Sequence, residues 1–129
     1  MTNTHGPTSD LTQFLSARAI PEVLAEELGV KLIGGAAAAE LLGLQSPIIG
    51  ECIAIPYRGT EYVRVRVLQP DDNGGARYLC PAGMPVPLYV PGATIERARE
   101  GQRVIVVESP LKAMAMVAAG FAAVGLGGI

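Results

Sequence analysis

The stretch RVIVVESPLKAMAMVAAGFAAVG, residues 103–125, decides which fold we expect for this chain. Residues 103–107 form a short, largely apolar run of the kind found in fully buried, parallel strands. Pro110 suits the first turn of a helix over residues 111–119, and a glycine follows where that helix should end. A second strand is expected at 122–124. A strand, a helix and a strand so closely spaced predict a compact βαβ unit.

The sequence before this βαβ unit begins with patterns that are typical of helices. Three short helices are predicted at 11–17, 21–28 and 36–42, from apolar residues spaced by three or four positions. Gly29 and Gly43 stand directly after the second and third, where glycine commonly ends a helix. Helices are therefore expected to precede the strands in this part of the chain.

Strand patterns follow these helices. Residues 52–57 are predicted as an apolar strand, and a short strand at 77–80 follows a glycine-rich turn. Residues 61–68 alternate strictly between two kinds of side chain, which is typical of a half-buried strand. Three valines form the expected core face of that strand, so Arg64 and Arg66 are expected to point outward together.

Composition excludes several classes of function. Charged residues make up 17% of the 129 residues and the net charge is −2, which excludes a globally basic nucleic-acid-binding protein but allows a local basic patch. The single histidine, His5, excludes histidine-based catalysis and histidine-rich metal sites. Cys52 and Cys80 form no CxxC motif, so no zinc site is expected; core packing is their expected role, and a disulfide between them is the open alternative.

These patterns predict an α+β protein with two parts. Residues 1–9 are expected to be a disordered tail, residues 10–100 a small N-terminal subdomain of helices and strands, and residues 101–129 the first βαβ unit of an α/β sheet. A buried parallel strand normally has neighbours on both sides, so we expect the chain to be the front part of a longer protein. The sequence shows neither a signal peptide nor a membrane-spanning stretch, so a cytoplasmic location with no membrane partner is expected.

Glu108 is the first candidate for chemistry, because it lies where the predicted strand meets the predicted helix. Ligands of open α/β sheets bind at the carboxyl ends of the strands, where a carboxylate can hold Mg²⁺ or transfer a proton in phosphoryl transfer. The backbone amides behind Ser109 can hold a phosphate, and Lys112 can pair with Glu108 or reach that phosphate. The plainer alternative is a carboxylate that complements the helix dipole, beside an ordinary exposed lysine.

Three arginines form the second candidate site. Arg64 and Arg66 share a strand face, and Arg77 follows across a turn, so paired strands would bring three guanidinium groups within about 10 Å. Guanidinium groups suit phosphate backbones, and Tyr62 and Tyr78 can stack on bases. The alternative is a solvated strand face whose arginines pair with nearby carboxylates.

The order of these pieces resembles the front of the catalytic core of bacterial-type DNA primases. The similarity is greatest to phage and plasmid primase-like proteins that carry a Toprim-like domain, and it spans residues 11–129. The segments that carry it are FLSARAIPEVLAEELGV (14–30), IAIPYRGTEYVRVRVL (53–68), ARYLCPAG (76–83), PLYVP (87–91) and VIVVESPLKAMAMVAAGFAAVGLGG (104–128). The resemblance implies a primase-core-like subdomain over residues 10–100 and the first βαβ unit of a Toprim-like sheet over residues 101–129.

The resemblance also assigns roles to residues. Glu108 matches the Toprim glutamate, which serves acid–base or metal-linked roles in phosphoryl transfer. Arg66 and Arg77 match basic positions that face the active-site cleft and the template or nucleotide. Lys112 matches a lysine typical of the phage and plasmid group, whereas Ser109 stands where the family usually has glycine.

The acidic set of a Toprim enzyme is incomplete in this sequence. No aspartate follows Asp72 and Glu108 is the last acidic residue, whereas Toprim chemistry uses a further Asp-x-Asp pair to hold magnesium. We therefore expect no catalysis and no cofactor for the chain alone. In the complete protein, a DNA primase-type nucleotidyltransferase is expected, with Mg²⁺ held partly by Glu108.

The function that the resemblance implies is that of the N-terminal portion of a primase-like DNA replication protein from a mobile element. Its expected partners are single-stranded DNA, nucleotides, and either the missing C-terminal part of a Toprim or helicase protein or a separate protein. The alternative is a non-enzymatic module, derived from a degenerate primase, that binds nucleic acid or protein.

Overall fold

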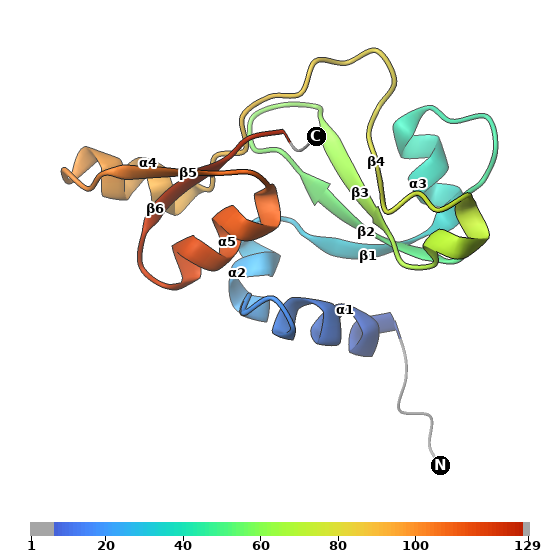
Figure 1. Ribbon diagram of the computed structural model, residues 1–129, viewed down its shortest axis with the longest axis horizontal. Helices are drawn as coiled ribbons and strands as arrows, with labels where there is room; N and C mark the ends of the chain where they lie inside the picture. The colour runs from blue at the N-terminus through green and yellow to red at the C-terminus, as the bar shows by residue number, and fades with distance from the viewer. Residues whose placement is uncertain (1–6, 128–129) are drawn as a thin grey trace.

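Two β-sheets organise this chain in the computed structural model, which describes residues 7–127 (Figure 1). The larger sheet is antiparallel with the order β1-β2-β3-β4, and the smaller one pairs β5 with β6 in parallel. The elements in chain order are α1 (Pro7–Ser16), α2 (Glu22–Glu27), β1 (Lys31–Gly34), α3 (Gly35–Leu42), β2 (Glu51–Pro56), β3 (Val63–Val67), η1 (Pro70–Asn73), β4 (Tyr78–Leu79), α4 (Gly92–Arg99), β5 (Val104–Val107), α5 (Pro110–Ala118) and β6 (Ala122–Gly125). The predicted α+β class is confirmed.

The three predicted N-terminal helices are all present. α1 begins at Pro7, so residues 7–9 belong to a helix and not to the predicted tail, whose residues 1–6 lie outside the described part of the chain. α3 ends at Gly43, which closes the helix in the left-handed conformation with a φ of 75°. The sequence does not predict β1, because its four residues are too few for an alternating pattern to stand out.

The antiparallel sheet is covered on both faces. Cys52 and Ala54 of β2 face the side of Val65 and Val67, where α3 packs, and all four side chains are buried. Ile53 and Ile55 face the opposite side and belong to the larger core, to which α1, α2 and α5 contribute side chains. Figure 1 shows α3 on one side of the sheet and α1 on the other. β2 is therefore buried on both faces.

Because both faces of the sheet are covered, the structure differs from the prediction for β3, the strand that carries Arg64 and Arg66. Val65 and Val67 are fully buried, as the alternation predicts. The prediction that Arg64 and Arg66 point outward together is wrong, because their cross-strand neighbours, Ile55 and Ile53, lie in the larger core. The Arg64 residue is only 7% exposed.

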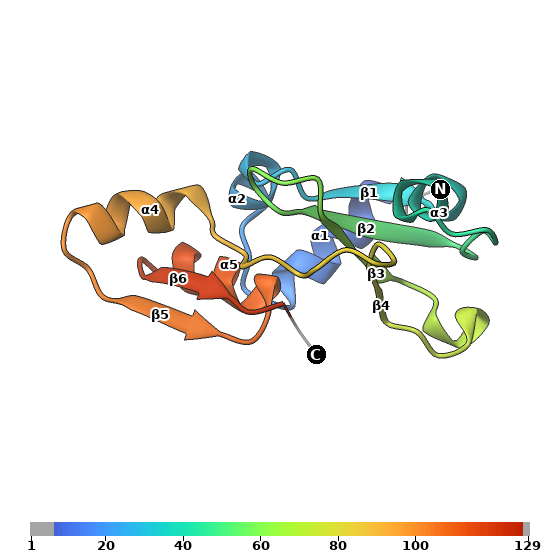
Figure 2. The same cartoon turned by 90° about the horizontal axis from the view of Figure 1, so that it is seen from above.

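The predicted βαβ unit is present as β5, α5 and β6, with parallel strands, but β5 is not the fully buried strand that the sequence predicts. Val104 is 43% exposed and Val106 is 59% exposed. α5 covers the face that carries Ile105 and Val107, whereas α4 packs on β6 and leaves the other face of β5 open (Figure 2). Among the described residues, β5 pairs only with β6.

The other edge of β6 is closed by hydrogen bonds. The buried Thr94 hydroxyl donates to the Ala123 carbonyl at 2.6 Å and accepts from the Ala123 amide at 3.0 Å. Tyr89 and Gly125 exchange backbone hydrogen bonds at 2.8 and 2.9 Å. These bonds connect the residue 89–94 segment to the βαβ unit.

The larger core joins both predicted parts of the chain. It contains Phe14, Leu15 and Ile53 from the N-terminal part and Leu111 and Met114 from α5. The division of the chain into two parts near residue 100 therefore stays a prediction. No helix among residues 7–127 is long and apolar enough to cross a membrane.

Gly35 is a position where the fold excludes a side chain. It is buried at the start of α3, and a Cβ there would overlap the carbonyl oxygens of Ile48 and Gly50. We predict that Gly35→Ala lowers the free energy of unfolding by about 1–3 kcal/mol, because backbone atoms must move to accept the methyl group.

Gly34→Ala is the matched control in urea denaturation of the two variants. A Cβ at Gly34 meets nothing within 4 Å, so we expect this variant to be unchanged or more stable by up to about 1 kcal/mol. Equal stability of the two variants would contradict the packing described for the start of α3.

Candidate functional site

A cleft lies between the isoleucine face of the antiparallel sheet and the N-terminal end of α5. Two adjoining hollows of about 300 and 350 Å³ form it, and they share Tyr78, Ser109 and Leu111. We call this region the arginine cleft and define it by the polar residues that line it or adjoin it, which are Arg18, Arg64, Arg66, Tyr78, Glu108, Ser109 and Lys112.

Strand register places two of the predicted arginines beside one tyrosine. Arg66 is directly opposite Tyr78 of β4, and its Nη1 donates a hydrogen bond to the Tyr78 hydroxyl at 3.1 Å. The guanidinium carbons of Arg66 and Arg64 lie 5.0 and 5.9 Å from the centre of the Tyr78 ring. Because i and i+2 residues of a strand share a face, this arrangement follows from the pairing of β3 with β4.

Arg18 is a third guanidinium at this cleft, and the sequence analysis missed it. It follows α1, where its Nη1 donates to the Phe14 carbonyl at 3.1 Å and its guanidinium lies 3.7 Å from the centre of the Phe14 ring. Arg66 lies 5.4 Å from the same ring. Burial and then the nearby charge of Arg66 lower the pKa of Arg18, although an arginine stays charged at neutral pH. No local sequence signal connects the end of α1 with β3.

Arg64 is the most buried charged residue of the cleft. Burial lowers the pKa of its guanidinium, but the neighbouring Tyr57, Cys80 and Tyr62 raise it more, so the pKa lies above its ordinary value. Arg64 lines the smaller hollow together with Ser109 and Pro110, so a permanent positive charge belongs to the wall of this hollow. A buried charge of this kind favours an anion that reaches it.

Tyr62 does not line the cleft, so the predicted stacking of this residue on bases is wrong. Its side chain is 1% exposed and packs edge-to-face on Tyr57, with ring centres 4.7 Å apart. Burial raises the pKa of Tyr62 to about 12, so the phenol is neutral at physiological pH. Tyr78, by contrast, is 37% exposed. The sequence pattern places both tyrosines near the arginines without showing that the core covers one of them.

Arg77 lies apart from the other arginines. Its carbonyl accepts a hydrogen bond from the Val67 amide at 2.8 Å, one position along from the Arg66–Tyr78 pair. Arg77 is exposed, lies in a bend directly before β4, and lines neither hollow of the cleft. Of the predicted cluster, the structure therefore places Arg64 and Arg66 at the cleft, and it adds Arg18 beside them.

Glu108 and Lys112 form an exposed ion pair at the rim of the cleft. The Lys112 Nζ donates to Glu108 Oε1, and both side chains are more than half exposed. This hydrogen bond and the charge of Lys112 lower the pKa of Glu108, so the carboxyl is ionised at neutral pH. An ionised, lysine-bound carboxylate is not suited to act as a general acid.

The residues present at Glu108 do not fit a magnesium ion. Mg²⁺ prefers several oxygen ligands in octahedral geometry, whereas Glu108 is a single carboxylate bound to an ammonium group. Residues 10–127 contain no group of three acidic, cysteine or histidine side chains that could hold a metal. A role for magnesium in a complete protein stays a prediction.

Ser109, and not Glu108, caps α5. The Ser109 Oγ accepts a hydrogen bond from the Lys112 amide at 3.2 Å, and Pro110 takes the first helical position. The serine in place of the family's glycine therefore has a local structural role. One of the first-turn amides is already bonded to this hydroxyl, which leaves fewer amides for the predicted phosphate.

Comparison of the chain with protein families, curated proteins and solved structures found no significant match. The resemblance to Toprim primases therefore stays a prediction from the sequence.

The ion pair predicts the acid–base behaviour of Glu108. In a pH titration followed by carboxyl-carbon NMR, we expect the pKa of Glu108 below its ordinary value. A lowered pKa in the folded state contributes stability above the ordinary glutamate pKa, and that stability is lost as the pH falls through the lowered pKa. We expect Lys112→Met to return the pKa of Glu108 to its ordinary value, whereas Lys31→Met, the same change at the other lysine, leaves it lowered. An unchanged pKa in Lys112→Met would contradict the pairing.

Proposed function

We propose that this chain binds the phosphates of single-stranded nucleic acid and of nucleotides in the arginine cleft, as part of a primase-like DNA replication protein. Three guanidinium groups from two elements distant in sequence meet over Phe14 and Tyr78. Planar guanidinium groups with several donors suit phosphate oxygens better than a single ammonium group does. This convergence is the observation that carries the proposal.

The charge distribution around the cleft supports an anionic ligand. The chain as a whole carries a net charge of −2, so the cleft is a local positive region on an acidic protein. Its only carboxylate, Glu108, is already neutralised by Lys112. Among the described residues, neither Arg18 nor Arg66 forms a salt bridge with a carboxylate. A bound phosphate would add a negative charge next to their guanidinium groups.

Tyr78 adds an aromatic surface next to these charges. Its ring is partly exposed and lies beside the guanidinium groups of Arg64 and Arg66. Proteins that bind single strands combine a cationic groove with aromatic rings on which bases stack. A single-stranded segment with its backbone at the arginines could place a base against Tyr78.

A second candidate function is that of a non-enzymatic module, and the Glu108–Lys112 pair favours it. An ionised carboxylate bound to lysine has no proton to give as a general acid. In this alternative the cleft binds nucleic acid or an acidic protein without catalysis. We place either activity in the cytoplasm, as the sequence analysis expects.

Fluorescence anisotropy with a labelled single-stranded oligonucleotide at two salt concentrations tests the proposal. The test variant is Arg18→Gln/Arg66→Gln, which spares the buried Arg64. The control variant is Arg77→Gln/Arg103→Gln, which makes the same change in net charge at exposed positions outside the cleft. Thermal unfolding of both variants shows whether they remain folded.

We expect the test variant to weaken binding by at least about tenfold, because two charge-assisted hydrogen bonds are lost. The slope of log affinity against log salt should also fall by about 0.7 for each phosphate contact removed. The control should bind like wild type. Equal losses in both variants, or no binding by the folded wild type at low salt, would contradict the proposal; the second result would favour a protein partner.

A further inference from the structure

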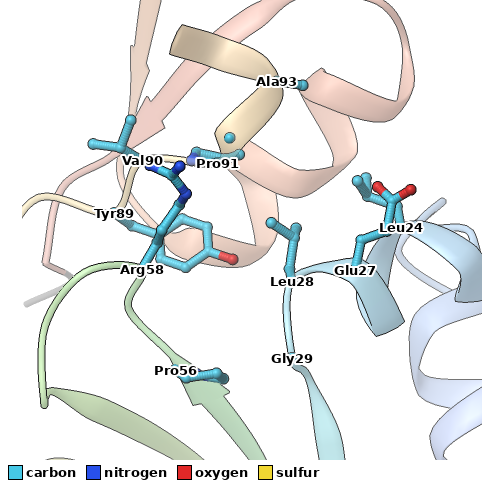
Figure 3. A pocket seen from close by; sticks show the side chains of 11 residues that line it. Leu24, Glu27, Leu28, Gly29, Pro56, Arg58, Tyr89, Val90, Pro91 and Ala93 are labelled. Atoms are coloured by element: carbon cyan, nitrogen blue, oxygen red, sulfur yellow. The ribbon is translucent and has the colours of Figure 1, made fainter.

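A second pocket lies on the far side of the tyrosine core from the arginine cleft. Its volume is about 330 Å³, and it opens between α2, the end of β2 and the start of α4 (Figure 3). Tyr57 contacts Tyr62 on one side and Tyr89 on the other, with ring centres 4.7 and 5.1 Å apart. Tyr89 lines this pocket, which shares no lining residue with the arginine cleft.

One end of the pocket suits an anion. Gly92 is the first residue of α4, and no side chain caps this helix. The first amides of a helix lack partners within it and carry its positive end, which favours phosphate groups. Arg58 lies over this end, since a Cβ on Gly92 would be 3.7 Å from its Nε. Arg58 is exposed and makes no ion pair with any carboxylate that the structure describes.

Tyr89 provides an independent sign that the pocket receives a polar ligand. The residue as a whole is only 2% exposed, and its hydroxyl reaches the pocket, where it makes no hydrogen bond to a residue that the structure describes (Figure 3). Burial raises the pKa of Tyr89, so the hydroxyl keeps its proton and can donate it. A donor that is fixed in the wall of a pocket and has no protein partner is available to a polar ligand.

The rest of the pocket is apolar, with one carboxylate near its rim. Leu24, Leu28 and Pro56 give the pocket an apolar surface, and Glu27 lies beside Leu24 (Figure 3). Gly29 contributes to this surface because it carries no side chain. A Cβ there would come 3.0 Å from the Pro56 Cγ, and its φ is +79°. The carboxylate of Glu27 can accept a hydrogen bond from an amino group.

We propose that this pocket binds a nucleoside 5′-monophosphate. The phosphate lies at the Gly92 and Ala93 amides beside Arg58, and the Tyr89 hydroxyl donates to a phosphate or sugar oxygen. The base lies on the apolar surface, with its amino group toward Glu27. The end that suits an anion, the Tyr89 hydroxyl and the apolar surface lie in one pocket of suitable size, and no single one of them would define this ligand. The proposal does not depend on the arginine cleft.

Titration of the ¹⁵N-labelled chain with adenosine 5′-monophosphate, followed by amide NMR, tests this site. We expect saturable shifts of the Gly29, Gly92 and Ala93 amides. Adenosine alone and inorganic phosphate alone should each bind at least about tenfold more weakly, because each lacks one half of the recognised chemistry.

Two variants and one control locate the binding. Arg58→Gln should weaken binding by about tenfold, and Tyr89→Phe, which keeps the ring packing, by about threefold. Arg103→Gln, an exposed arginine outside the pocket, should bind like wild type.

Three results would overturn the proposal. The first is the absence of saturable shifts at Gly92 and Ala93 up to about 10 mM of the nucleotide. The second is an equal loss of affinity in Arg58→Gln and Arg103→Gln. The third is a loss caused by Arg66→Gln but not by Arg58→Gln, which would assign the nucleotide to the arginine cleft and leave the proposed function intact.

Discussion

The burial of strand β2 on both faces is the constraint on which the rest of the structure depends. Cys52 and Ala54 lie on the face that α3 covers, and Ile53 and Ile55 lie on the face that α1, α2 and α5 cover. A strand covered in this way cannot shift its register by one residue, because every side chain would change faces. Its pairing with β3 therefore fixes Arg64 opposite Ile55 and Arg66 opposite Ile53. Two charged groups are held at the border of an apolar core as a consequence.

This border becomes a cleft because α5 packs on the same face. Leu111 and Met114 reach the core beside Ile53 and Ile55, and this contact brings the capped start of α5 over Arg64. The long aliphatic parts of arginines can pack on apolar groups while their charged ends reach solvent or an anion. The same apolar packing that stabilises the sheet thus positions the guanidinium groups. The exposed Glu108–Lys112 pair lies at the rim and contributes no comparable positioning.

Sequence patterns predict the elements of this fold better than they predict what covers them. The helices at 11–17, 21–28 and 36–42, the strand at 52–57 and the βαβ order depend on spacing, proline and glycine, which act locally. Alternation in 61–68 correctly separates two faces, but it cannot show that helices from distant parts of the chain cover both. That long-range packing explains the wrong predictions for Arg64, Tyr62 and the exposed valines of β5. It also explains why Arg18 and the Tyr89 pocket could not be predicted, since each unites residues that are distant in sequence.

The central claim is that the register of β3 and the packing of α5 together make one face of the sheet a phosphate-binding surface. The NMR signals of the arginine side chains on that face test this claim directly. The measurement is a ¹⁵N NMR spectrum of the arginine Nε–Hε groups, recorded while a short oligothymidylate is added at low salt. The account predicts that the Arg18, Arg64 and Arg66 signals shift together and saturate, while the Arg77 and Arg103 signals do not move. Equal shifts at Arg77, which lines neither hollow of the cleft, would contradict it.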